Sequence, residues 1–160
     1  MNKAVFLDRD GTLNVDYGYV YKLEDLVFID GVLESLRQLQ KAGFLLIIIT
    51  NQSGIGRRMF SQEDAISFNL HLIKELNKDG IFINDIFMCP HSPTQNCDCR
   101  KPSPKMILEG IEKYKINPEK SFMLGDKNID VESGTRAGVQ SFLVNKKKPL
   151  SFWTNYILNL

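Results

Sequence analysis

Ala4-Val5-Phe6-Leu7-Asp8-Arg9-Asp10-Gly11-Thr12 is the stretch of sequence that decides the fold. Its four apolar residues predict a buried strand, and the aspartates follow where a glycine permits a tight turn. Side chains alternate along a strand, so Asp8 and Asp10 are expected to point the same way. Two neighbouring carboxylates repel each other unless one is protonated or a cation lies between them. The motif therefore predicts a reaction centre with a hard metal ion and an aspartate nucleophile.

The rest of the chain alternates between apolar runs and helical periodicities. The expected strands are residues 3–8, 44–49, 86–88, 122–124 and 141–144, and the expected helices start near 31, 61, 104 and 128. This alternation predicts a Rossmann-like, three-layer α/β/α fold around a central parallel sheet. In the helix that Ser61 begins, the pattern predicts a buried stripe of Ile66, Leu70, Ile73 and Leu76.

The length of the chain predicts one domain over residues 1–160. The intervals from Asp10 to Thr50 and from Thr50 to Lys101 are too short to hold a folded cap domain, so the domain is expected to be capless. The tail at 149–160 has no charged side chain and is expected to dock against the body of the protein.

The overall charge and the apolar runs of the chain limit the kinds of partner that the protein can bind. A net charge of +1 argues against binding to nucleic acid or to an anionic membrane. The longest apolar run, 44–49, is too short to cross a bilayer. The first strand begins almost at once, so no signal peptide is expected. These features predict a cytoplasmic protein, and a monomer is the default expectation.

The three cysteines all lie in one short segment, 89–99, together with a histidine. Clustered cysteines in odd number do not suit a secreted disulfide scaffold. Three thiolates and one imidazole suit a tetrahedral, structural Zn²⁺ site, and a loop with free thiols is the alternative. The predicted zinc ligands are Cys89, His91, Cys97 and Cys99.

Polar side chains follow four of the expected strands, at the edge where ligands bind in parallel sheets. The candidate residues there are Asp8, Asp10, Thr50, Asn51, Gln52, Ser53, Arg100, Lys101, Asp126 and Lys127. This set suits phosphoryl transfer through an aspartyl phosphate, with Mg²⁺ offsetting the repulsion between the attacking anion and the phosphate.

Each type of side chain has a part in that chemistry. Asp126 can complete a Mg²⁺ site with Asp8. The hydroxyl and amide of Thr50-Asn51 and the backbone N–H groups of the Ser53-Gly54 turn can bind phosphate oxygens. Lys101 can neutralise the transferring group, and Asp10 remains as general acid and base.

The motifs Asp8-x-Asp10-Gly-Thr, Thr50-Asn51, Lys101 and Gly125-Asp126 together resemble the haloacid dehalogenase (HAD) superfamily of phosphatases, over nearly the whole chain. Within it, the chain is most similar to the branch of D-glycero-D-manno-heptose 1,7-bisphosphate 7-phosphatases. The segments that carry this similarity are 8–14, 17–20, 50–57, 97–102 and 125–127.

The resemblance implies Asp8 as nucleophile, Asp10 as acid and base, and Mg²⁺ held by Asp8, Asp126 and the Asp10 backbone carbonyl. It also implies that Arg100 and Lys127 reach the substrate. The product would be a heptose 1-phosphate for nucleotide-heptose biosynthesis, by the ADP-heptose route of lipopolysaccharide or by a GDP-heptose route.

Two other functions fit part of the sequence. Histidinol-phosphate phosphatases share the aspartate motif and the zinc loop, but there we expect aspartate and arginine where this chain has Ser53 and Lys127. A receiver-type signalling domain also forms an aspartyl phosphate, but after its third strand and without a zinc loop.

The roles of three charged residues stay open. Arg57 and Arg58 either contact a second phosphate or lie in a solvated loop. Asp130 either supports the metal site or faces water.

Overall fold

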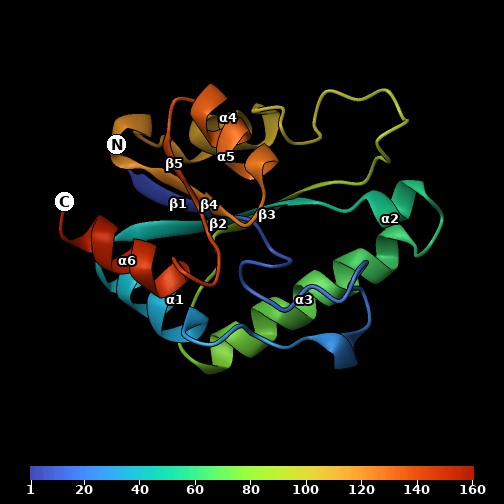
Figure 1. The fold of residues 1–160 in the computed structure, drawn as a ribbon, viewed down its shortest axis with the longest axis horizontal. Coiled ribbons are helices and arrows are strands. Elements are labelled where there is room, and N and C mark those ends of the chain that lie inside the picture. Colours follow the sequence, from blue (N-terminus) through green and yellow to red (C-terminus); the bar gives the residue numbers. More distant parts are fainter.

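The computed structural model describes all 160 residues and contains a five-stranded sheet with helices on both faces (Figure 1). The strands are β1 (Lys3–Leu7), β2 (Phe44–Asn51), β3 (Asp85–Cys89), β4 (Phe122–Gly125) and β5 (Gln140–Leu143). All pairs are parallel, in the order β3-β2-β1-β4-β5. The predicted three-layer fold is confirmed, although β2 ends two residues later than expected. The strand order reverses at β1, which is where such sheets form their binding crevice.

The helices cover the two faces unequally. They are α1 (Val32–Lys41), α2 (Ser53–Gly56), α3 (Gln62–Lys78), α4 (Lys105–Tyr114), α5 (Asn128–Arg136) and α6 (Leu150–Leu158), with 3₁₀ turns η1 (Leu23–Asp25) and η2 (Pro118–Lys120). In Figure 1, α1, α3 and α6 lie on one face of the sheet, and α4 and α5 lie on the other. None of these helices combines the length and the apolar character that a membrane span requires.

Buried side chains on both faces explain why the central strands are apolar throughout. Val5 and Leu7 of β1 pack in the core beneath α1, α3 and α6, whereas Ala4 and Phe6 pack in the core on the opposite face. Ile48 and Ile47 of β2 divide between the two cores in the same way. A strand covered on both sides cannot alternate apolar with polar residues.

The N-terminus of α3 is as predicted. The backbone N–H of Asp64 donates to Ser61 Oγ at 3.0 Å, and the backbone N–H of Ser61 donates to Asp64 Oδ2 at 3.0 Å. The two bonds complete a capping box.

The predicted buried stripe of α3 is correct at Leu76 but wrong at Ile66 and Leu70. Ile66 is 45% exposed and Leu70 is 61% exposed. The buried residues are Ala65, Phe68, Asn69, Leu72 and Leu76. The helix buries the face that carries Phe68 and Leu72 instead, and Asn69 lies on that face, where its side chain accepts a hydrogen bond from Arg9.

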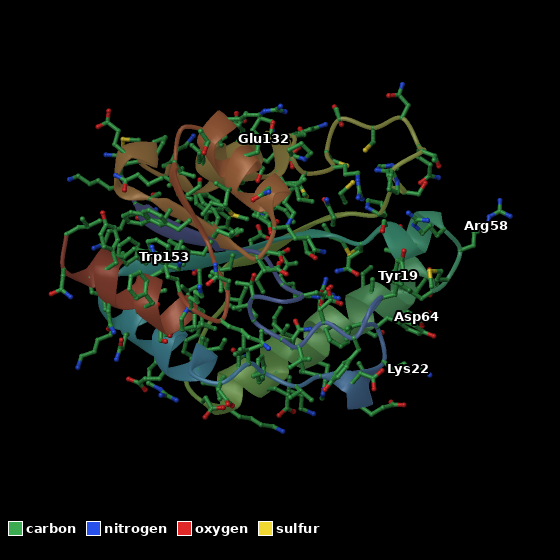
Figure 2. The ribbon with its side chains drawn as sticks, viewed as in Figure 1. Tyr19, Lys22, Arg58, Asp64, Glu132 and Trp153 are labelled. Carbon is green, nitrogen blue, oxygen red and sulfur yellow. The ribbon has the colours of Figure 1, made fainter.

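The tail docks against the body, as expected. Trp153 of α6 donates its indole N–H to the carbonyl of Leu143 at 2.9 Å and stacks on Phe142 at a centroid distance of 4.3 Å (Figure 2). Leu150 and Ile157 are buried in the same core as α1. The assignment of residues 1–160 to one domain remains a prediction.

Candidate active site

The carboxyl ends of β1, β2 and β4 meet at a cavity of about 250 Å³. The predicted site residues that line it are Asp8, Asp10, Asn51, Gln52, Ser53, Lys101 and Lys127. The structure thus brings most of the candidate set to one place, from residues as far apart in the sequence as Asp8 and Lys127.

A buried lysine forms the electrostatic centre of this cavity. Lys101 is only 2% exposed, and its Nζ lies 2.7 Å from Asp8 Oδ1, 2.7 Å from Asp130 Oδ1 and 2.8 Å from the carbonyl oxygen of Ile49. Burial opposes its charge, but Asp8 and Asp130 outweigh burial and raise the pKa of Lys101. Lys101 is therefore a cation held directly against the proposed nucleophile.

Asp130 is fully buried rather than water-facing. Its Oδ1 binds Lys101, and its Oδ2 accepts the backbone N–H of Lys127 at 3.0 Å. Burial raises the pKa of Asp130, and the nearby charge of Asp8 raises it further, while Lys101 opposes both. Both carboxylate oxygens are engaged, so Asp130 acts as a support for Lys101.

Asn51 also holds Lys101. Its side-chain Oδ1 accepts the backbone N–H of Lys101 at 3.0 Å, and its Nδ2 donates to the Lys101 carbonyl at 3.2 Å. The hydroxyl of Thr50 accepts a bond from Gln52 Nε2 at 2.8 Å and does not line the cavity. These two predicted phosphate ligands are therefore engaged with protein groups.

Asp126 carries an unsatisfied buried oxygen. Carboxylate oxygens of Asp8, Asp126 and Asp130 all lie within 4.8 Å of one another, and Asp126 Oδ1 is buried with no hydrogen-bond partner. Burial first, and Asp8 second, raise the pKa of Asp126 to about 7. A hard dication with oxygen ligands would satisfy that atom and offset the repulsion. The residues present therefore fit Mg²⁺.

Gly11 allows Asp126 to approach this closely. Its φ angle is +84°, and a Cβ atom at position 11 would lie 2.2 Å from Asp126 Oδ2. Only glycine combines this backbone conformation with the contact, which explains the glycine in the aspartate motif.

Asp10 faces a different set of groups. Its Oδ1 accepts Arg9 Nε at 3.0 Å and Asn14 Nδ2 at 2.9 Å, and its Oδ2 accepts Arg9 Nη2 at 3.0 Å and Gln52 Nε2 at 3.0 Å. Each aspartate of the motif thus contacts its own protein cation, Lys101 at Asp8 and Arg9 at Asp10.

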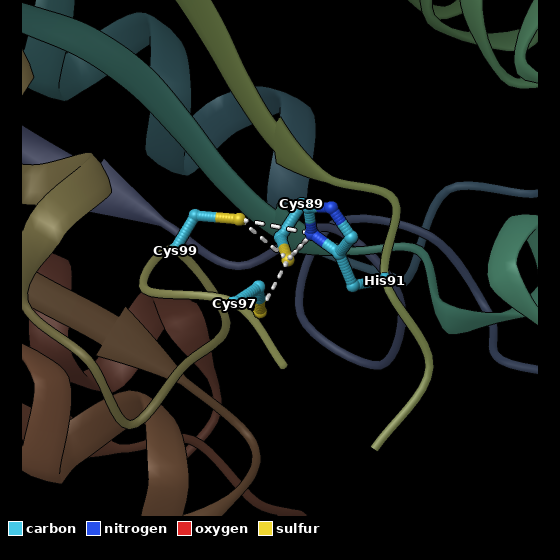
Figure 3. A group of neighbouring side chains, drawn as sticks. All are labelled: Cys89, His91, Cys97 and Cys99. Carbon is cyan, nitrogen blue, oxygen red and sulfur yellow. Dashed lines mark hydrogen bonds between the residues drawn. The ribbon is translucent and has the colours of Figure 1, made fainter. Parts of the chain in front are cut away.

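The predicted zinc ligands converge (Figure 3). The Sγ atom of Cys89 lies 2.9 Å from Cys99 Sγ, 3.9 Å from Cys97 Sγ and 3.4 Å from His91 Nδ1. All four ligand atoms lie within 4.8 Å of one another. Zn–S bonds of about 2.3 Å place tetrahedral sulfur ligands about 3.8 Å apart, so the cluster fits a structural Zn²⁺ ion.

The comparisons with known proteins agree with this geometry. Residues 14–144 match the haloacid dehalogenase-like hydrolase family. The chain belongs to this family. A Haemophilus influenzae protein named D-glycero-beta-D-manno-heptose-1,7-bisphosphate 7-phosphatase is 43% identical to this hydrolase over 158 residues, covering 94% of this chain and 86% of that protein. The protein of the same name from Escherichia coli K12 is 40% identical over 156 residues, covering 92% and 82%.

A solved structure extends the similarity. The D,D-heptose 1,7-bisphosphate phosphatase from B. bronchiseptica, complexed with magnesium and phosphate, matches this hydrolase with a TM-score of 0.91. The two are 27% identical, and the match covers 98% of each chain.

The cavity of this hydrolase is also lined by residues with no predicted site role. Asp16, Gly18 and Tyr19 line it, and Asp16 Oδ1 accepts the backbone N–H of Gly18 at 2.8 Å. Gly18 and Tyr19 have φ angles of +83° and +53°. In Figure 2, Tyr19 appears near the N-terminal end of α3. The Asp-x-Gly spacing, which favours a turn, is the signal that could have placed this loop.

Three predicted phosphate-binding arginines lie outside the cavity. Arg57 and Arg58 are exposed, and Arg58 projects away from the molecule in Figure 2. Arg100 donates from Nη1 to the carbonyl of His91 at 3.5 Å and does not line the cavity. Of the cations considered for a second phosphate, only Lys127 lines the cavity.

The zinc loop of the hydrolase is tied to the reaction centre. The backbone N–H of Gln52 donates to the carbonyl of Cys89 at 2.8 Å, and that of Gly56 donates to the carbonyl of Pro90 at 2.9 Å. At its other end, Cys99 stands two residues before Lys101. The loop therefore joins the turn after β2 to the buried lysine.

Replacing Cys97 by Ser is expected to remove zinc and to lower kcat about tenfold. Loss of the ion frees the segment that positions Lys101, and a small displacement of a catalytic cation is costly. Zinc content and steady-state phosphate release check this, with the exposed loop residue Asn96→Ser as the control that retains both. Full activity in a zinc-free Cys97→Ser protein would contradict the expectation.

Replacing Asp126 by Asn is expected to stabilise the magnesium-free protein, and more at about pH 8 than at about pH 5. The folded-state pKa of about 7 lies above the ordinary 3.8, so the folded state binds the proton more tightly. Wild-type stability therefore falls as the pH rises from about 4 to about 7, and the whole penalty is present above that range. The asparagine has no such titration.

Thermal unfolding of both proteins at the two pH values, without magnesium, measures this difference. Added magnesium should then raise the Tm of the wild type but not that of Asp126→Asn. An equal Tm difference at both pH values would show that the Asp126 carboxyl does not titrate there.

Proposed function

We propose that the protein is a Mg²⁺-dependent phosphatase that removes the C7 phosphate of D-glycero-D-manno-heptose 1,7-bisphosphate. The product, heptose 1-phosphate, would serve nucleotide-heptose biosynthesis. The observation that carries the proposal is the contact of Lys101 with Asp8 at 2.7 Å, beside the unsatisfied oxygen of Asp126. The names of the relatives at 40% and 43% identity support this choice of substrate.

In the proposed reaction, the Asp8 carboxylate attacks phosphorus and forms an aspartyl phosphate. Lys101 neutralises negative charge at the transferring group. Asp10 donates a proton to the leaving oxygen and then takes one from the attacking water. Asp8, Asp126 and the Asp10 backbone carbonyl would hold Mg²⁺. When bound, this ion supplies positive charge that offsets repulsion between the nucleophile and the phosphate.

The turn after β2 is the proposed binding site for the transferring phosphate. Ser53 and Gly54 line the cavity, and backbone N–H groups at such a turn are suited to anions. Gln52 lines it as well. Thr50 and Asn51 would then act by holding Gln52 and Lys101 in place.

Lys127 is the proposed contact for the phosphate that is retained on the sugar, because it lines the cavity. Arg57 and Arg100 would have to move to take part in binding. The proposed setting is the cytoplasm, and the proposed form is a monomer that acts on this small molecule without nucleic acid or membrane.

Phosphate release from both anomers of heptose 1,7-bisphosphate and from histidinol phosphate, with and without magnesium, tests the proposal. We expect Mg²⁺-dependent turnover of the heptose substrate, with phosphorus NMR showing that the C1 phosphate remains. A kcat/KM for histidinol phosphate that is tenfold higher or more would overturn the substrate assignment. Phosphorylation of the protein without continuing release would indicate a signalling domain.

A further inference from the structure

Arg9 lies between the two aspartates of the motif and is fully buried, with 0% exposure. Its Nη1 donates to Asn69 Oδ1 of α3 at 2.9 Å, and its Nη2 donates to the carbonyl of Val20 at 2.8 Å. The guanidinium carbon lies 4.4 Å from the centre of the Phe68 ring. These contacts fix the planar group in position and in orientation.

The same guanidinium binds both oxygens of Asp10 through Nε and Nη2, each at 3.0 Å. Together with Asn14 and Gln52, it supplies four N–H donors, which fill the four acceptor positions of a carboxylate. Asp10 can exchange a proton with substrate or water only if one of these donors breaks its hydrogen bond to the carboxylate.

The two carboxylate oxygens of Asp10 differ in whether one of their donors can be displaced from the cavity. Oδ1 is held by Arg9 and Asn14, both of which are 0% exposed and neither of which lines the cavity. Oδ2 is held by Arg9 and by Gln52, and Gln52 lines the cavity. A substrate oxygen or a water molecule can replace the Gln52 amide without opening the core.

We propose that Arg9, anchored on Asn69, is the positioning residue that directs Asp10 Oδ2 to the reacting oxygens. This inference rests on the proposed function. As the Asp8–phosphorus bond forms and the bond from phosphorus to the leaving oxygen breaks, Oδ2 gives its proton to that oxygen. As water oxygen bonds to phosphorus and the Asp8–phosphorus bond breaks, Oδ2 takes a proton from that water.

The role of Asn69 makes this testable, because Asn69 does not line the cavity. Without it, Arg9 Nη1 loses its acceptor, and the guanidinium can turn away from Asp10. An alkyl phosphate needs its leaving oxygen protonated, whereas p-nitrophenyl phosphate releases a weakly basic phenolate. The variant should therefore lose activity selectively on the alkyl substrate.

The experiment compares kcat/KM on heptose 1,7-bisphosphate and on p-nitrophenyl phosphate. We expect Asn69→Ala to lower the value for the heptose substrate about tenfold and the aryl value less than about twofold. Arg9→Lys should lower kcat/KM for the heptose substrate about a hundredfold. A lysine ammonium cannot bind both oxygens of Asp10 at once, as the guanidinium of Arg9 does. The control is Leu72→Ala, a buried position on the same helix, which should lower Tm but leave the ratio of the two values unchanged.

Equal losses on both substrates in Asn69→Ala, or no loss on either, would overturn the inference. If the Arg9→Lys variant does not fold, the Asn69→Ala variant alone tests the inference. A wild-type protein that is inactive on both substrates would instead reject the proposed function.

Discussion

Replacing Asp8 by Asn is expected to lower kcat by a factor of more than about 10⁴, because the amide has no anionic oxygen to attack phosphorus. The asparagine Oδ1 can still accept the hydrogen bond from Lys101, so the cavity is expected to keep its shape. Phosphate release at saturating substrate and magnesium measures the loss, and thermal unfolding verifies that the variant folds.

Asp130→Asn is the matched control for Asp8→Asn. Asp130 binds the same lysine at the same distance of 2.7 Å, so both substitutions remove one negative charge beside Lys101. We expect Asp130→Asn to lose activity only about tenfold, since it does not bond to phosphorus. Similar losses in the two variants would show that charge, and not nucleophilic attack, explains the effect of Asp8.

Replacing Lys101 by Met is expected to have the largest combined effect on stability and activity. It leaves Asp8 and Asp130 buried at 7% and 1% exposure without the cation that both contact. Removal of one partner from a buried ion pair costs about 3–5 kcal/mol of the free energy of unfolding. Loss of the charge at the transferring phosphate should lower kcat about 10³-fold. Urea unfolding and steady-state kinetics measure the two effects.

The double variant Lys101→Met with Asp130→Asn separates these effects. It restores the net charge of the cluster, and the asparagine can still accept the backbone N–H of Lys127. We expect most of the lost stability to return while activity stays low. Recovery of activity in the double variant would contradict a direct role for Lys101 at the phosphate.

The predictable part of the site comes from local patterns. An apolar run followed by polar residues marks the end of a buried strand, so Asp8 and Asp126 could be placed at one edge of the sheet. The zinc ligands could be predicted because all four lie within an eleven-residue segment. In both cases, the chemistry depends on residues that are close together in the sequence or on a regular element.

The role of Arg9 depends on partners that no local pattern shows. Its acceptors Val20 and Asn69 lie 11 and 60 residues away, and an arginine at the end of a strand ordinarily faces solvent. Asn69 shares the buried face of α3 with Phe68 and Leu72, and Ile66 and Leu70 lie outside that face. Which of the two apolar faces of α3 is buried therefore depends on tertiary contacts that the periodicity of the helix does not show.

Asn51 is a second residue whose role the local sequence could not predict. An amide after a strand can bind phosphate or backbone, and its partner in the structure is the peptide of Lys101, 50 residues away. Residue type and position identified it as a site residue, but the choice between binding phosphate and holding the lysine needed tertiary structure.

The most direct test of the proposed chemistry is to trap the phosphorylated protein. Asp10→Asn is incubated with magnesium and p-nitrophenyl phosphate, quenched in acid and mapped by peptide mass spectrometry. Without a base to activate water, the aspartyl phosphate should accumulate, and one phosphoryl group should appear on Asp8. A phosphoryl group on another residue, or none while the wild type turns over the same substrate, would contradict Asp8 as the nucleophile.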